Sequence, residues 1–142
     1  MEQDVPESLV AKFRSDPFLR YLGVRITEVR RGYCRAEMKV GGDMLNFHGV
    51  AHGGAIFTLA DAAFAVASNS HGTRAVALMM DIAFRHPAME GDELVAEATE
   101  TSLGRRTALY YITVRKTDGT LVASCQGMVF RSGESIENTT KE

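Results

Sequence analysis

The chain has 142 residues, of which 45% are hydrophobic and 24% charged, so it can bury the core of one soluble domain. A formal net charge of −2 does not indicate the basic surface that binds nucleic acid. No apolar run approaches the ~20 residues of a membrane span. No signal peptide is indicated, and two distant cysteines, Cys34 and Cys125, are typical of free core thiols in a reducing compartment. We therefore expect one domain over residues 1–142, in the cytoplasm, without nucleic-acid or membrane partners.

The first forty residues predict a short helix followed by two strands. Residues 6–15 place their apolar side chains on one helical face, and Asp16-Pro17 is expected to end that helix. Alternation of apolar and polar residues then predicts strands over 22–31 and 34–40. The short connection between them favours antiparallel pairing.

The longest helical signal follows a loop and a His-Gly-Gly turn, and Gly72 is its expected end. The segment is rich in alanine, the strongest helix former, and it is apolar on nearly all sides, as a buried helix is. It contains one acid, Asp61. Because burial of a carboxylate without partners is costly, the presence of an acid in this helix indicates a specific role. The apolar stripe of helical period consists of Ile56, Leu59, Ala60, Ala63, Phe64 and Ala67.

Four strands are predicted after the helix, each by apolar residues that alternate with polar ones. Short turns join most of them, which favours an antiparallel sheet, and a single sheet with one helix against it is an α+β fold. Because the helix is apolar all round, the sheet must curve about it or a second subunit must cover the remainder. From about residue 132 the chain is polar and is expected to fray. The predicted strands cover residues 76–84, 93–101, 108–114 and 121–129.

Two sequence motifs carry a resemblance to a known family. Residues 46–54 read N-x-x-G-x-x-H-G-G, and residues 59–64 read L-A-D-x-x-F. This spacing resembles the PaaI-type hotdog-fold acyl-CoA thioesterases of phenylacetate catabolism, and weaker agreement extends over about residues 18–131. The resemblance implies a curved antiparallel sheet of about five to six strands wrapped around one long central helix. It also implies obligate homodimers, often paired into tetramers.

Thioester hydrolysis requires a group that activates water or attacks the carbonyl, together with donors for the developing oxyanion. Asp61 is the candidate acid, because desolvation within an apolar helix would raise its pKa toward the range of a general base. Gly53 offers a backbone N–H at the helix N-terminus, where no side chain obstructs the substrate. Asn46 offers a side-chain amide to orient water or the carbonyl, and His52 is expected to shape the turn or line the pocket. Whether Asp61 is a base or a nucleophile stays open.

Five further residues are candidates for binding the substrate. Thr58, on the helix, is a candidate for lining the acyl pocket, and Gly54 belongs to the turn at the start of the helix. Arg85, Arg105 and Arg106 are candidates for holding the coenzyme A phosphates, since arginine binds phosphate bidentately. Each of these arginines also suits a solvated surface.

Gly53 and Asp61 are eight residues apart, which places them about 12 Å apart along one helix. They cannot both contact one carbonyl group. Two antiparallel copies of the helix would bring Asp61 of one subunit to Gly53 of the other, and two-fold symmetry would create two such sites. The resemblance implies the same shared site, so we expect a homodimer that pairs into a dimer of dimers.

The expected activity is hydrolysis of an acyl-CoA thioester, and the resemblance points to phenylacetyl or hydroxylated phenylacetyl groups. One alternative is a hotdog hydratase or dehydratase acting on an enoyl thioester, although the histidine and acid motifs of such enzymes are absent. Another is an acyl-CoA-binding module without catalysis, against which the intact Asp61 argues. His48 and His52 have i, i+4 spacing but no third ligand nearby, so neither a metal nor a cofactor is expected.

Overall fold

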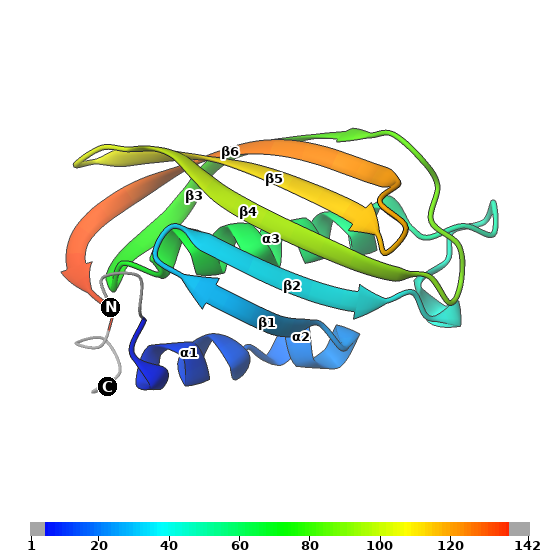
Figure 1. The fold of residues 1–142 in the computed structure, drawn as a ribbon, viewed down its shortest axis with the longest axis horizontal. Coiled ribbons are helices and arrows are strands. Elements are labelled where there is room, and N and C mark those ends of the chain that lie inside the picture. Colours follow the sequence, from blue (N-terminus) through cyan, green and yellow to red (C-terminus); the bar gives the residue numbers. More distant parts are fainter. Residues whose placement is uncertain (1–4, 137–142) are drawn as a thin grey trace.

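A six-stranded antiparallel sheet curves around one long helix, α3 (Gly53–Asn69), which lies along its concave face (Figure 1). The computed structural model describes residues 5–136. Two strands precede α3 and four follow it, so the predicted α+β arrangement is confirmed. The spatial order of the strands is β1-β2-β4-β5-β6-β3. The other elements are α1 (Glu7–Arg14), α2 (Pro17–Leu22), β1 (Arg25–Arg30), β2 (Tyr33–Lys39), the 3₁₀ turn η1 (Gly42–Met44), β3 (Thr73–Phe84), β4 (Glu93–Leu103), β5 (Thr107–Lys116) and β6 (Leu121–Ser135).

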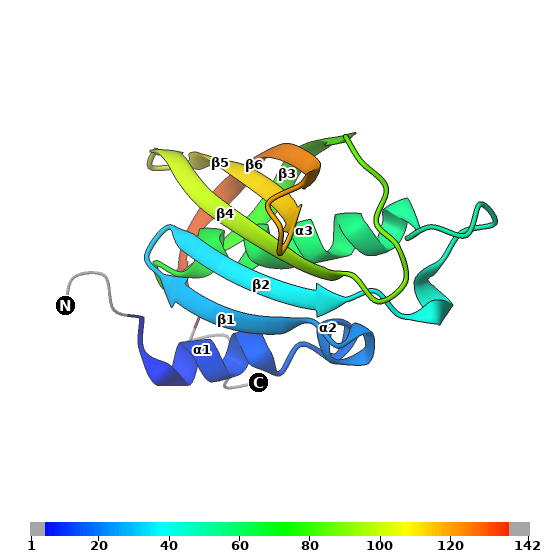
Figure 2. The same ribbon diagram turned by 45° about the vertical axis from the view of Figure 1, so that its right-hand side comes forward.

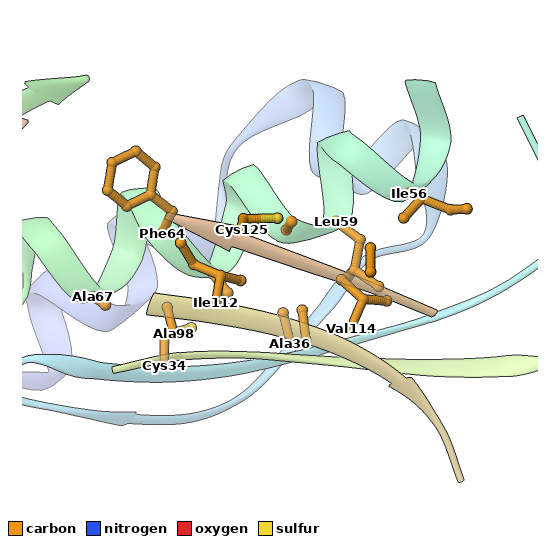
Figure 3. Close-up of a cluster of buried hydrophobic side chains, with 14 of the residues drawn as sticks. Cys34, Ala36, Ile56, Leu59, Phe64, Ala67, Ala98, Ile112, Val114 and Cys125 are labelled. Atoms are coloured by element: carbon orange, nitrogen blue, oxygen red, sulfur yellow. The ribbon is translucent and has the colours of Figure 1, made fainter. Parts of the chain in front are cut away.

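The core fills the space between α3 and the sheet (Figure 3). Alternate residues of β4, β5 and β6 point inward and are buried, as their sequence alternation predicts. Ala36 and Ala98 are fully buried on this inner face, and their small side chains let the helix approach the sheet closely. Cys34 and Cys125 are buried free thiols, and burial raises their pKa values to about 12 and about 11. Both cysteines are therefore protonated core residues, as predicted.

A glycine in β6 makes room for the largest aromatic contact of the core. The Phe64 ring of α3 packs against Tyr110 of β5, with ring centroids 5.8 Å apart and an interplanar angle of 62°. A Cβ atom on Gly127 would lie 2.5 Å from Cζ of Phe64. Since a contact that short is sterically forbidden, only glycine fits opposite this ring.

Buried hydrogen bonds join the end of α3 to the loop between β1 and β2. The Ser70 hydroxyl accepts the Gly32 N–H at 2.7 Å and donates to the Ala67 carbonyl at 2.7 Å. Nearby, one carboxylate oxygen of Glu100 accepts the Tyr110 hydroxyl at 2.8 Å and lies 2.7 Å from Nε2 of His71. These contacts fix the C-terminal end of the helix against β4 and β5.

The first helix ends before Asp16-Pro17, as predicted, but a second helix that was not predicted starts at this dipeptide. The Asp16 carboxylate caps α2 by accepting the N–H groups of Phe18 and Leu19, at 3.0 and 3.2 Å. Pro17 occupies the first turn, where its missing N–H costs nothing. As Figure 2 shows, α1 and α2 run alongside β1, outside the arch of the sheet.

β3 forms one edge of the sheet, and of the strands in the described part of the chain only β6 pairs with it. Four apolar residues along the strand are between 47% and 57% exposed: Val76, Leu78, Met79 and Phe84. A long edge strand with exposed apolar side chains is unusual on a soluble monomer.

The expectation of a frayed tail from about residue 132 is wrong for its first residues. β6 continues to Ser135, which is paired with Thr73 of β3. Ile136 follows and is 8% exposed, so it belongs to the packed structure although its neighbours are polar. The rest of the predicted tail lies outside the described residues.

Candidate active site

The N-terminus of α3 presents an unoccupied backbone donor. His52 caps the helix, and its Nδ1 accepts the Gly54 N–H at 2.8 Å. The histidine therefore shapes the turn, which is one of the two roles predicted for it. The adjacent Gly53 N–H has no acceptor within residues 5–136. An N–H at this position is favourably placed for an anion because the helix dipole adds to it.

Asn46 lies next to this helix end because of the tight loop that it organises. Its Oδ1 accepts the N–H groups of His48 and Val50, at 2.9 and 3.3 Å, and its backbone N–H donates to the Val50 carbonyl at 2.8 Å. The oxygen is engaged in the loop, whereas the amide nitrogen has no acceptor within residues 5–136 and so offers its two donors to a ligand.

Asn46 and Gly53 line one cavity of about 300 Å³, which we call the Gly53 cavity. Arg85 and His86, which follow β3, line it as well, and so does the Phe84 ring. The structure therefore brings together one backbone N–H, one side-chain amide and one guanidinium. All three are donors suited to a carbonyl oxygen or to phosphate.

Asp61 lies in a different and larger cavity, of about 510 Å³, between the outer face of α3 and the α1–α2 segment; we call it the Asp61 cavity. Asp61 is half-buried, and this burial is the main cause that raises its pKa above the ordinary carboxyl value. The negative charge of Asp16 is the second cause. A carboxylate with a raised pKa is a stronger proton acceptor, as a general base requires.

Thr58 lies in the Asp61 cavity, one turn before the acid. Its hydroxyl donates to the Gly54 carbonyl at 2.8 Å, so the Thr58 oxygen faces a ligand only as an acceptor. The remainder of the Asp61 cavity is largely apolar, with the rings of Phe13, Phe18 and Phe57 among its lining residues. This composition suits an acyl or aryl group better than a polar one.

The predicted phosphate-binding arginines do not gather in one chain. Arg85 lines the Gly53 cavity, whereas Arg105 and Arg106 lie in the turn between β4 and β5. That turn is at the opposite end of the sheet from the Gly53 cavity. Thr107, which follows the turn, pairs with Phe130 toward the C-terminal end of β6. Phe84, which lines the Gly53 cavity, pairs with Ala123 near the N-terminal end of β6.

Sequence reasoning missed two residues that border these cavities. Phe84 was recognised only as part of a strand, and Asp16 only as part of a helix end. The dipeptide Asp16-Pro17 was itself a usable signal, since aspartate at the cap and proline in the first turn are typical of a helix start.

Within residues 5–136, no three histidine, cysteine, aspartate or glutamate side chains lie close enough together to hold a metal ion. No helix of the described part of the chain is both long and apolar enough to cross a bilayer.

Comparison with known proteins identifies the family. The family model for the thioesterase superfamily matches residues 48–123, more than half of the chain and a stretch that includes α3 and Asp61. Acyl-coenzyme A thioesterase PaaI of Escherichia coli is 37% identical over 126 residues, which is 89% of this chain and 90% of that protein.

Solved structures agree with this family. The structure of the E. coli PaaI protein superposes with a TM-score of 0.87 at 36% identity, covering 91% of this chain and 94% of that one. Phenylacetic acid degradation protein PaaI of Thermus thermophilus, solved as a mutant, gives a TM-score of 0.79 at 42% identity, covering 82% and 99%. A protein of Streptococcus pneumoniae named as a hypothetical thioesterase, solved with coenzyme A, gives a TM-score of 0.82 at 25% identity, covering 89% and 98%. The predicted hotdog fold is thus confirmed, and the chain belongs to the thioesterase superfamily as a thioester hydrolase.

Proposed function

We propose that the protein is an acyl-CoA thioesterase that hydrolyses phenylacetyl-CoA, hydroxylated phenylacetyl-CoA or a related aryl thioester to the free acid and coenzyme A. The observation that carries this proposal is the half-buried Asp61 carboxylate, which faces an apolar cavity lined by aromatic rings. The similarity to PaaI, a protein named as an acyl-coenzyme A thioesterase, supports the same substrate class. We also propose a cytoplasmic location and a role in phenylacetate catabolism.

The complete site is shared between two subunits. Asp61 and Gly53 line separate cavities of one chain, about 12 Å apart along α3, so one chain cannot present both to a single carbonyl group. Pairing of the edge strand β3 with β3 of a second copy would cover the exposed apolar side chains of that strand. It would also set the two α3 helices side by side and antiparallel on one face of a continuous sheet. Asp61 of one subunit then approaches Gly53 of the other, and two such dimers associate into a tetramer.

The same pairing accounts for the distant arginines. Antiparallel β3 strands place the Val76 end of one subunit beside the Phe84 end of the other. Arg105 and Arg106 of the partner subunit then lie at the same end of the sheet as Arg85. The three arginines together would hold the coenzyme A phosphates, which no single chain can do with all three.

In the proposed reaction, the thioester carbonyl oxygen accepts hydrogen bonds from the Gly53 N–H and from the Asn46 amide. The Asp61 carboxylate takes a proton from water while the water oxygen bonds to the carbonyl carbon, and the oxyanion that forms is stabilised by the same donors. The carbon–sulfur bond then breaks, and the leaving thiolate receives the proton from Asp61. The products are a carboxylic acid and free coenzyme A.

A nucleophilic route uses the same carboxylate differently: Asp61 attacks the carbonyl carbon, and the carbon–sulfur bond breaks to release the coenzyme A thiolate. Water then hydrolyses the resulting anhydride to the product acid and the free Asp61 carboxylate, and the proton released protonates the thiolate. A single turnover in ¹⁸O-labelled water separates the two routes. General-base catalysis puts the label only in the product acid. Attack by Asp61 puts it into the Asp61 side chain when water attacks that carbonyl of the anhydride.

The first test is release of free thiol from a panel of acyl-CoAs, with phenylacetyl-CoA and straight-chain thioesters side by side. Wild type is expected to prefer aryl thioesters, and Asp61→Asn to lose about 100-fold or more in kcat, the usual contribution of a general base. Tight acyl-CoA binding without thiol release would instead favour a binding module. Addition of water to an enoyl-CoA would favour a hydratase.

A further inference from the structure

The Asp61 cavity has a wall that comes from the N-terminal helices. The lining residues of α3 face a segment that runs from Lys12 in α1 to Leu19 in α2, and Ile136 closes one side. Asp16 belongs to this segment, lines the same cavity as Asp61 and carries a charge of the same sign.

Asp16 is held in place by backbone hydrogen bonds. Its Oδ1 accepts the N–H groups of Phe18 and Leu19, which are the free donors of the first turn of α2. The position of this charge is therefore set by the helix cap rather than by a flexible side chain. Asparagine makes the same cap through its carbonyl oxygen, so the charge can be removed while the geometry is kept.

The other charged groups that face Asp61 are few. From α1, Lys12 lines the cavity as an exposed ammonium, and from α3 the remaining polar residues, Thr58 and Asn69, are neutral. The C-terminal part of the chain contributes the apolar Ile136. Among residues 5–136, Asp16 is thus the negative group that shares this cavity with Asp61.

We propose that Asp16 is a positioning residue for hydrolysis, whose fixed negative charge across the cavity makes Asp61 a stronger proton acceptor. The inference rests on the proposed function, in which Asp61 accepts a proton from water. A like charge disfavours the ionised form of a carboxylate, in the same direction as burial does. Because Asp16 is exposed to solvent, its effect is the smaller of the two and is screened by salt.

The test uses Asp16→Asn, with Asp16→Ser as a second variant that also keeps a capping oxygen. Two quantities are measured at low salt: the ¹³C-detected titration of the Asp61 carboxyl, and the acidic limb of the pH profile of kcat/KM for thiol release. Both are expected to move to lower pH in both variants, and the displacement is expected to shrink as salt is added. A residue that only supported the fold would lower activity without moving the limb.

The matched control is Asp118→Asn. Asp118 lies in the turn between β5 and β6, accepts the Thr120 N–H at 2.9 Å and lies outside the Asp61 cavity. The variant removes one negative charge from an aspartate that also accepts a backbone N–H, but outside the cavity, so it should leave the titration and the limb at the wild-type positions.

If the Asp61 titration and the acidic limb both stay at their wild-type positions in the Asp16 variants, the inference is overturned. The proposed thioesterase function would be unaffected by that result. Absence of thiol release from every acyl-CoA, or full activity in Asp61→Asn, would instead overturn the proposed function. In that case the carboxyl titration still reports whether the charge of Asp16 reaches Asp61.

Discussion

The Phe84 ring lies directly over Gly53: a Cβ atom on Gly53 would be 3.2 Å from Cζ of Phe84. Gly53 begins α3 and Phe84 ends β3, so this contact joins the candidate oxyanion donor to the edge strand. A side chain at position 53 would meet the ring and crowd the approach to the Gly53 N–H. Gly53→Val is therefore a suitable way to block this half of the site.

Complementation between two inactive chains tests whether the site is shared. A chain with Asp61→Ala and a chain with Gly53→Val are expected to be inactive as homodimers. A heterodimer isolated through two affinity tags keeps one site with both groups intact, so about half of the wild-type activity should return. The measurement is thiol release per mole of dimer.

The control for this experiment is a heterodimer in which one chain carries both substitutions and the other carries none. In a shared site that arrangement leaves no complete site, so it should be inactive. Activity there, together with none in the first heterodimer, would show that each chain contains a whole site.

The raised pKa of Asp61 also affects stability. Because burial and Asp16 raise this pKa, the folded chain holds the Asp61 proton more tightly than the unfolded chain does. The unfolded state binds fewer protons in the window between the ordinary and the raised pKa, so stability falls as pH rises through that window. Asp61→Asn should therefore unfold at a higher temperature than wild type at pH 7, and the difference should disappear as pH falls below the window.

Thermal unfolding across pH checks this prediction, with Asp118→Asn as a contrast of opposite sign. Hydrogen bonds from Thr120 lower the pKa of Asp118, so its charge favours folding at neutral pH and this benefit is lost on acidification. A stability gain in Asp61→Asn that stays the same at every pH would point to packing instead of charge.

Gly127→Ala is expected to destabilise the protein by about 1–3 kcal/mol, the usual cost of overpacking a core. The added methyl group would lie 2.5 Å from the Phe64 ring, and the ring cannot move freely because it packs on Tyr110. Urea unfolding measures the loss. In Gly127→Ala with Phe64→Leu the two losses should be less than additive, and full additivity would argue against this contact as the cause.

Ser70→Ala should cost about 1–3 kcal/mol, because it leaves the buried Gly32 N–H without its acceptor. Ser68→Ala is the matched control: both serines are 2% exposed, but Ser68 donates to Ala65 within its own helix and receives no amide from the sheet. Chemical denaturation of the two variants gives the comparison. Equal losses would mean that the bond to Gly32 contributes little.

Much of the fold could be predicted because its pattern is local. Strands β4, β5 and β6 alternate regularly, and the alanine-rich α3 carries its apolar stripe at helical spacing. The second helix was missed because Asp16-Pro17 suits a helix end as well as a helix start, and only the hydrogen bonds to Phe18 and Leu19 decide between them. Ile136 was missed because one apolar residue among polar ones gives no periodicity.

The candidate site was predictable in part. Asp61 stood out as the one acid of an apolar helix, and the helix rise alone showed that Gly53 lies too far away to act with it in the same chain. The partners of these residues were not predictable. Phe84 reaches Gly53 and Asp16 reaches the Asp61 cavity only through the tertiary fold, and no spacing in the sequence encodes those approaches.

The edge strand has a consequence for the newly made chain. The Asn69 side chain binds the backbone N–H and C=O of Ala75, but beyond Ala75 the outer side of β3 offers backbone N–H and C=O groups that no described strand pairs, beside the exposed Val76 and Leu78. Such an edge is a template for any extended polypeptide, and this is how sheet proteins begin to aggregate. The stretch contains no proline and two charged side chains, Arg74 and Asp81, so it has few of the usual safeguards. Assembly with a second copy would therefore protect solubility as well as complete the site, and substitutions that weaken it should produce precipitation together with loss of turnover.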